Sequence, residues 1–152
     1  MSLNEVPQQV EWPQTHYVFV EKVGPFQQNA WLAWQTAHGC IEELQKHNRI
    51  LRQMSLYKPG PQIYRAGFAL QAPPVNLPQG MAYELFRGGA YSRFVLTGSY
   101  SQLPQASGRV WDLVAQNAVP LRDDFAIEHY VNNPATTPEE ELVTEILIPT
   151  AD

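Results

Sequence analysis

Two kinds of hydrophobic pattern recur along the chain. Residues 16–26 and 90–100 are runs rich in β-branched and aromatic residues, and each ends in a glycine, one further residue and an aromatic ring. Such runs favour β-strands. The stretches that follow, about 28–46 and 102–117, carry apolar residues at a period near 3.6, which predicts two amphipathic helices. Their apolar stripes are Trp34, Ala37, Ile41 and Leu44 in the first helix, and Leu103, Ala106, Val110 and Val114 in the second.

Two further strand candidates follow each helix, separated by loops rich in proline and glycine. Both parts of the chain therefore read strand, helix, strand, strand, and Gly24 recurs as Gly98, 74 positions later. We predict an α+β fold in a single domain, residues 1–152, made of two βαββ halves, about 16–87 and 90–149. One face of each sheet packs under its helix, and the other meets the opposite half or holds a ligand. The strands after the helices are expected at 62–70 and 81–87, and at 125–132 and 142–149.

The composition narrows the function classes. Only 16% of the residues are charged and the net charge is −5, so the chain has no basic surface that could neutralise a run of phosphates. We therefore expect no nucleic-acid partner, whereas an acidic balance permits cationic ligands. The single cysteine, Cys40, the lack of an apolar signal core and the lack of a long apolar run favour a cytoplasmic protein without a membrane span.

One carboxylate lies in the middle of an apolar strand. Along 125–132, Phe125 and Ile127 fall on one side, and Glu128 and Tyr130 fall on the other. An ionised carboxylate in such a place costs several kcal/mol unless it is paired, or else its pKa rises. Left unpaired among aromatic rings, it attracts an organic cation, to which each ring adds roughly 0.5 to 2 kcal/mol. With a raised pKa, it can instead act as a general acid or base near neutral pH.

The alternative is an internal ion pair. Arg93 lies on a candidate neighbouring strand and Arg65 on a strand of the first half, and either could neutralise Glu128. Glu145, on the last strand, either faces the same ligand cleft as Glu128 or is a solvated charge at the sheet edge.

Several motifs of the second half together resemble the GyrI-like small-molecule-binding domain. They are "YSRFVLTGSYSQLPQASGRVWDLV", "FAIEHYVNNP" and "EEELVTEILIP". The resemblance implies two βαββ halves related by a pseudo-two-fold axis with a central ligand cleft, a fold that also serves as the effector-binding domain of some AraC-type and MerR-type regulators. It implies that Glu128 and Tyr130 meet cationic, aromatic ligands. No helix-turn-helix fits before residue 16, so a regulatory role would need a separate DNA-binding partner.

The resemblance leaves three functions open. The first is a stand-alone protein that captures a hydrophobic aromatic molecule, which can be a cation. The second is a hydrolase of strained cyclopropane-bearing natural products, in which Glu128 activates water and Tyr130 donates a proton. The third is a protein-binding modulator of DNA gyrase. The expected ligand-binding residues are Glu128, Tyr130, Trp111, Tyr83, Phe68, Tyr91 and Glu145, whereas Trp34 is expected in the core.

No cofactor or metal is expected. His38, Cys40 and His47 do not converge on one face of a helix at a metal-binding spacing. His16 and His129 are isolated in the sequence, and both are predicted to be exposed.

Overall fold

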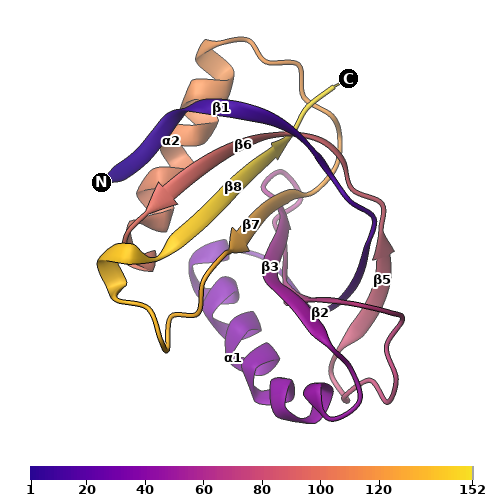
Figure 1. The fold of residues 1–152 in the computed structure, drawn as a ribbon. Helices are drawn as coiled ribbons and strands as arrows, with labels where there is room; N and C mark the ends of the chain where they lie inside the picture. The colour runs from indigo at the N-terminus through magenta and orange to yellow at the C-terminus, as the bar shows by residue number, and fades with distance from the viewer. Residues whose placement is uncertain (152) are drawn as a thin grey trace. The chain divides into compact units, whose positions relative to one another are not determined.

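The computed structural model describes residues 1–151, which divide into two compact halves (Figure 1). One half runs from Pro13 to Gly88. The other joins Met1–Trp12 to the chain from Gly89 onward. Residues 1–12, which lie outside both predicted halves, therefore belong with the second.

The first half contains one helix and a four-stranded antiparallel sheet in the order β3-β4-β2-β5. Helix α1 lies over β2 and β4. It buries Ala33, Ala37 and Leu44, so the predicted stripe is confirmed at two of its positions. The elements of this half are β2 (Thr15–Val23), α1 (Phe26–Gln45), β3 (Ile50–Lys58), β4 (Ile63–Leu70) and β5 (Ala82–Phe86).

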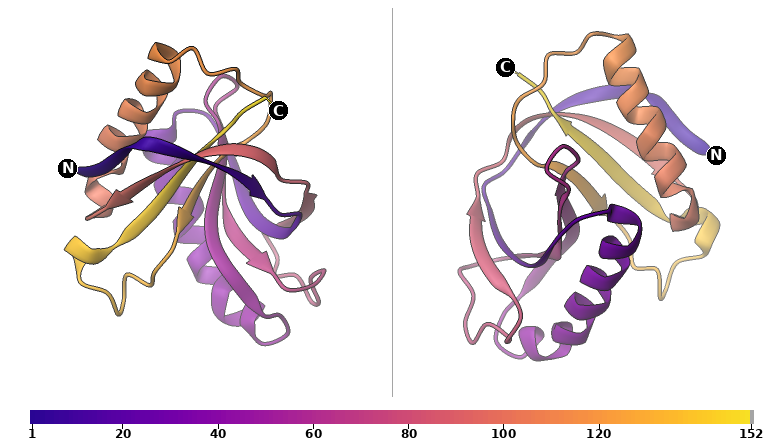
Figure 2. Two further views of the ribbon diagram at one scale, coloured as in Figure 1. Left: turned by 45° about the horizontal axis from the view of Figure 1, so that its top comes forward. Right: turned by 180° about the vertical axis from the view of Figure 1, so that it is seen from behind.

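The second half is built in the same way, with the strand order β1-β6-β8-β7 (Figure 2). Helix α2 lies over β1 and β6 and buries Ala106, Val110, Leu113 and Val114. Its elements are β1 (Ser2–Trp12), β6 (Gly89–Thr97), α2 (Leu103–Gln116), β7 (Ala126–Tyr130), β8 (Val143–Pro149), and the 3-10 turns η1 (Tyr100–Gln102) and η2 (Glu139–Glu141).

The prediction of an α+β fold with βαββ halves is confirmed, but the assignment of the first-half strands is wrong. Strand β3 was missed, and β4 rather than β5 completes the βαββ unit. Strand β5 is an extra edge strand beside β2, as β1 is beside β6. The pattern of β3 hides it, because Leu51 is an exposed hydrophobic residue while the four consecutive residues Met54–Tyr57 are buried on both faces of the sheet, so apolar and polar positions do not alternate. Strand β1 is mostly exposed, as an edge strand can be, so it shows little hydrophobic alternation.

The internal duplication extends to backbone detail. Gly24 and Gly98 follow β2 and β6 with φ of 131° and 136°, a conformation that only glycine adopts easily. The Gly24 N–H donates to the carbonyl of Gln62 at 2.9 Å, and the Gly98 N–H donates to the carbonyl of Leu142 at 2.8 Å. Each half thus ties the turn before its helix to the residue that precedes its last βαββ strand.

Candidate functional site

Strand β7 places two polar side chains together on the helix side of its sheet. Glu128 lies opposite Ile146, and Tyr130 lies opposite Thr144, in an antiparallel register that puts all four on one face. The Tyr130 hydroxyl donates a hydrogen bond of 2.9 Å to Glu128 Oε1. The predicted shared face of Glu128 and Tyr130 is therefore confirmed.

Glu128 is a half-buried acid whose charge is disfavoured. Burial raises the pKa of its carboxyl from 4.5 to about 6, and the hydrogen bond from Tyr130 opposes part of that rise. At pH 7 roughly nine-tenths of the molecules still carry the ionised form. The carboxylate is therefore mostly an anion at pH 7, and it takes up a proton near pH 6.

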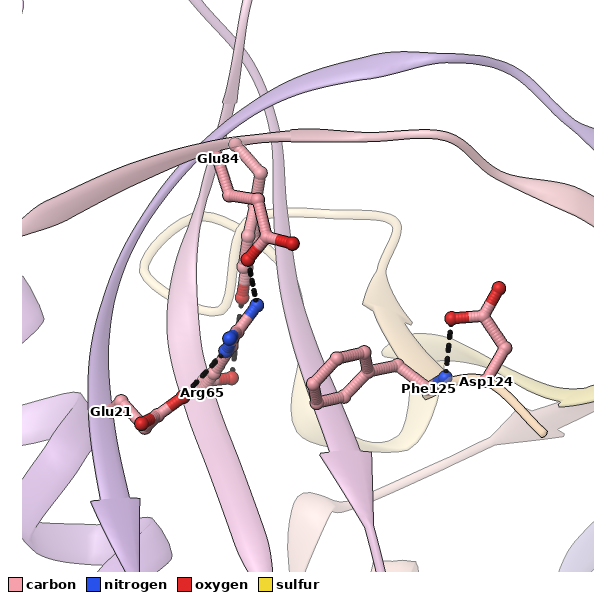
Figure 3. Close-up of polar contacts among 6 residues, drawn as sticks. Glu21, Arg65, Glu84, Asp124 and Phe125 are labelled. Atoms are coloured by element: carbon pink, nitrogen blue, oxygen red, sulfur yellow. Dashed lines mark hydrogen bonds and ion pairs between the residues drawn. The ribbon is translucent and has the colours of Figure 1, made fainter.

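Both arginines considered as counter-ions have carboxylate partners within their own halves. Arg65 forms ion pairs with Glu21 at 2.8 Å and Glu84 at 2.5 Å, all within the first half (Figure 3). Arg93 forms an ion pair of 3.4 Å with Glu145. Within residues 1–12 and 89–151, no lysine, arginine or histidine pairs with Glu128.

A second tyrosine, Tyr100, which the sequence analysis did not select, completes the cluster. The ring of Tyr100 lies edge-on to that of Tyr130, with centroids 5.5 Å apart and planes at 62°. Its hydroxyl is buried and has no hydrogen-bond partner in the described residues, and burial raises its pKa. The sequence signal that could have identified Tyr100 is its position, two residues after Gly98.

Glu145 does not share a sheet face with Glu128, and its predicted place in a ligand cleft stays a prediction. Glu145 lies opposite His129 in the β7–β8 register, so both point to the other side of the sheet. There His129 Nδ1 lies 2.7 Å from Glu145 Oε1, and its ring stands edge-on to Trp12. His129 is 7% exposed, so its prediction as an exposed residue is wrong. Strand pairing, which sets the register, thus gives this buried histidine a half-buried carboxylate partner.

The other predicted ligand-binding residues lie at separate places within their own halves. Tyr91 is fully buried on the opposite face of the sheet, where its hydroxyl donates a hydrogen bond of 2.7 Å to the carbonyl of Phe125. The backbone N–H of Phe125 in turn donates a hydrogen bond to the carboxylate of Asp124 (Figure 3). Phe68 is fully buried in the first half. Tyr83 is exposed at the edge of the first-half sheet and bonds to His16. Trp111 is half-buried on α2.

Residues 1–151 contain neither a cluster of potential metal ligands nor a helix suited to span a membrane. No group of three or more histidine, cysteine, aspartate or glutamate side chains converges there on a possible metal position. None of the helices in that part of the chain is both long and apolar enough to cross a bilayer.

The comparisons with known proteins agree with this fold. The family model described as "GyrI-like small molecule binding domain" matches residues 6–151. The chain belongs to the GyrI-like family. Comparison with curated protein sequences gives no match.

Solved structures resemble this GyrI-like chain over nearly its whole length. The C-terminal domain of EcmrR is 15% identical with a TM-score of 0.80, and the match covers 100% of this chain and 99% of that one. SAV2435, solved bound to tetraphenylphosphonium, is 16% identical with a TM-score of 0.77 and coverages of 95% and 93%. A hydrolase from Listeria innocua is 9% identical with a TM-score of 0.62 and coverages of 97% and 93%. At these identities the likeness shows the fold alone.

Proposed function

We propose that this GyrI-like domain binds a hydrophobic, cationic aromatic molecule at the helix-side face of β7. The observation that supports it is Glu128, an acid whose pKa is raised by burial and which has no ion pair in its own half. A bound cation would supply the missing counter-charge. Tyr130 and Tyr100 present ring surface beside it, which adds cation–π attraction. The predicted position of the ligand in a cleft between the halves stays a prediction.

The proposal has support from one relative. SAV2435 was solved with tetraphenylphosphonium, which is a hydrophobic cation with four aromatic rings. A permanent cation of this kind cannot lose its charge, so it is a suitable probe for a site that depends on a carboxylate.

The test is a titration with tetraphenylphosphonium followed by the protein's intrinsic fluorescence. We expect Glu128→Gln to weaken binding by roughly tenfold to a hundredfold, since two opposite charges about 6 Å apart attract each other by about 3 kcal/mol at an effective dielectric constant of about 20. Glu145→Gln is the matched control, because it removes a carboxylate from the opposite face of the same sheet. Equal affinities for wild type and Glu128→Gln would refute the proposal.

A hydrolase is the second candidate, because the same geometry suits a proton transfer. A carboxylate with a pKa of about 6 can take a proton from water, and the Tyr130 hydroxyl at 2.9 Å can return one to a leaving group. Turnover of a cyclopropane-bearing substrate that is abolished in both Glu128→Gln and Tyr130→Phe would favour this candidate. Binding without turnover would leave the domain a binder. A gyrase or regulator partner stays a prediction from the resemblance.

A further inference from the structure

The two halves repeat the same strand register, so their side chains can be matched one to one. Val20 of β2 lies opposite Ala66 of β4, and Phe94 of β6 lies opposite Ile146 of β8. Val20 and Phe94 each lie four positions before the glycine that follows the strand. Ala66 is therefore the counterpart of Ile146.

This match gives Glu128 a counterpart in the first half. Ser55 of β3 lies opposite Ala66, as Glu128 lies opposite the counterpart of Ala66 on β8. Two residues further along, Tyr57 corresponds to Tyr130. The Glu-x-Tyr sequence of β7 is therefore repeated in β3 as Ser-x-Tyr.

The aromatic contacts confirm the correspondence. The ring of Phe26, at the start of α1, stands edge-on to Tyr57 with centroids 5.9 Å apart. Tyr100 stands edge-on to Tyr130 at 5.5 Å. Phe26 and Tyr100 each come two positions after the glycine that ends the turn. The two halves thus carry the same constellation, with a serine in one and a carboxylate in the other.

In the first half, the N–H of a tryptophan ring donates hydrogen bonds to this cluster. The indole Nε1 of Trp34 donates to Ser55 Oγ at 3.1 Å and to the Tyr64 hydroxyl at 2.8 Å. Its ring also lies edge-on to Phe68 at 6.0 Å. Trp34 can reach these groups because α1 lies over β2 and β4.

In the second half, the helix position that corresponds to Trp34 carries no such side chain. Ala33 and Ala106 are the first buried alanines of the two helical stripes, and the residues that follow them are Trp34 and Ser107. The next position of α2 is Gly108, where an added Cβ would meet nothing within 4 Å. Helix α2 also lies over β1 and β6, one strand further from β7 than α1 lies from β3. No large helix side chain corresponds to the indole of Trp34.

A buried hydroxyl in the second half lacks the donor that this indole supplies in the first. Tyr64 lies opposite Tyr57, and Thr144 lies opposite Tyr130, so Thr144 is the counterpart of Tyr64. Thr144 is 0% exposed, and its Oγ1 has no hydrogen-bond partner within residues 1–151. It shares a face with Glu128. An unpartnered buried hydroxyl beside an unpaired acid is an arrangement that a ligand donor would satisfy.

We propose that the ligand of this face is a planar aromatic cation whose charged nitrogen carries an N–H, and that this group donates to Glu128 and Thr144. The indole of Trp34 makes the equivalent contacts to Ser55 and Tyr64. This inference rests on the proposed function and adds a selectivity to it. Protonated heteroaromatic amines are preferred over permanent cations that have no N–H.

The test compares two dyes of the same three-ring shape. 9-Aminoacridine is protonated at neutral pH and carries N–H donors, whereas 10-methylacridinium is permanently charged and carries none. We expect the wild-type protein to bind 9-aminoacridine more tightly by roughly three- to tenfold, the effect of one net hydrogen bond. Thr144→Val should reduce this preference by weakening 9-aminoacridine binding alone, because only the donation to Glu128 is left. Thr144→Ser, which keeps the hydroxyl, should retain the preference in full. Circular dichroism and thermal melting establish that each variant is folded.

The outcomes separate this inference from the function on which it rests. Equal binding of the two dyes by the wild-type protein, or a preference as large in Thr144→Val as in the wild type, would overturn this inference. If Glu128→Gln still weakens both dyes in that case, cation binding itself stands. If Glu128→Gln weakens neither dye, the proposed function fails as well.

Discussion

The pH dependence of cation binding follows directly from the environment of Glu128. Burial raises the pKa of this carboxyl to about 6, and only the ionised form attracts a cation. With that pKa, lowering the pH from 8 to 5 should weaken tetraphenylphosphonium binding about elevenfold, because about nine-tenths of the molecules are then protonated. A carboxyl with the ordinary pKa of 4.5 would weaken binding only about 1.3-fold over the same range. The two cases are well separated.

The assay is a set of fluorescence or calorimetric titrations between pH 4.5 and 8. Tetraphenylphosphonium has no titratable group, so the protein alone sets the pH dependence. The logarithm of Kd should be flat above pH 7 and rise by nearly one unit per pH unit below 5.5. Calorimetry near pH 6 should also detect proton release, since a bound cation lowers the pKa of the carboxyl. Glu128→Gln should show no such dependence. A wild-type midpoint near 4.5, or a flat profile, would refute the assignment of Glu128.

Three further predictions concern stability and the tuning of the acid. The folded state disfavours ionised Glu128, and this free-energy cost is absent below pH 4.5 and complete above pH 6. Glu128→Gln should therefore stabilise the protein by about 2 kcal/mol at pH 8 and by little at pH 4, as measured by urea unfolding. Tyr130→Phe removes the hydrogen bond that lowers the pKa, so the midpoint of cation binding should move above 6. Gly98→Ala should lower the free energy of unfolding by about 1 to 3 kcal/mol, because φ is 136° and the new Cβ would lie 2.9 Å from the side chain of Gln102. Gly108→Ala should instead stabilise α2 by about 0.5 to 1 kcal/mol, because its Cβ meets nothing. Equal effects of the two substitutions on thermal melting would contradict both expectations.

Much of the architecture could be predicted from local pattern. The helices, the strand that bears Glu128 and the glycine turns each depend on a period of 3.6 or 2, or on one conformation that favours glycine. The shared face of Glu128 and Tyr130 follows from alternation alone. The edge strand β1 and strand β3 could not be recognised in the same way. An edge strand such as β1 buries too little to alternate, and β3 buries the four consecutive residues Met54–Tyr57, so neither shows a period of two.

The partners of each charged group required the tertiary structure. Arg65, Arg93 and Glu145 were all possible neighbours of Glu128 by sequence, and strand register places Glu145 with His129 on the other face. The lack of an ion pair to Glu128 within its half follows from the same register. Alternation along a strand is a property of neighbouring residues, so the sequence by itself determined which side chains share a face. Pairing between strands joins residues far apart in the chain, so only the fold decided which of them meet.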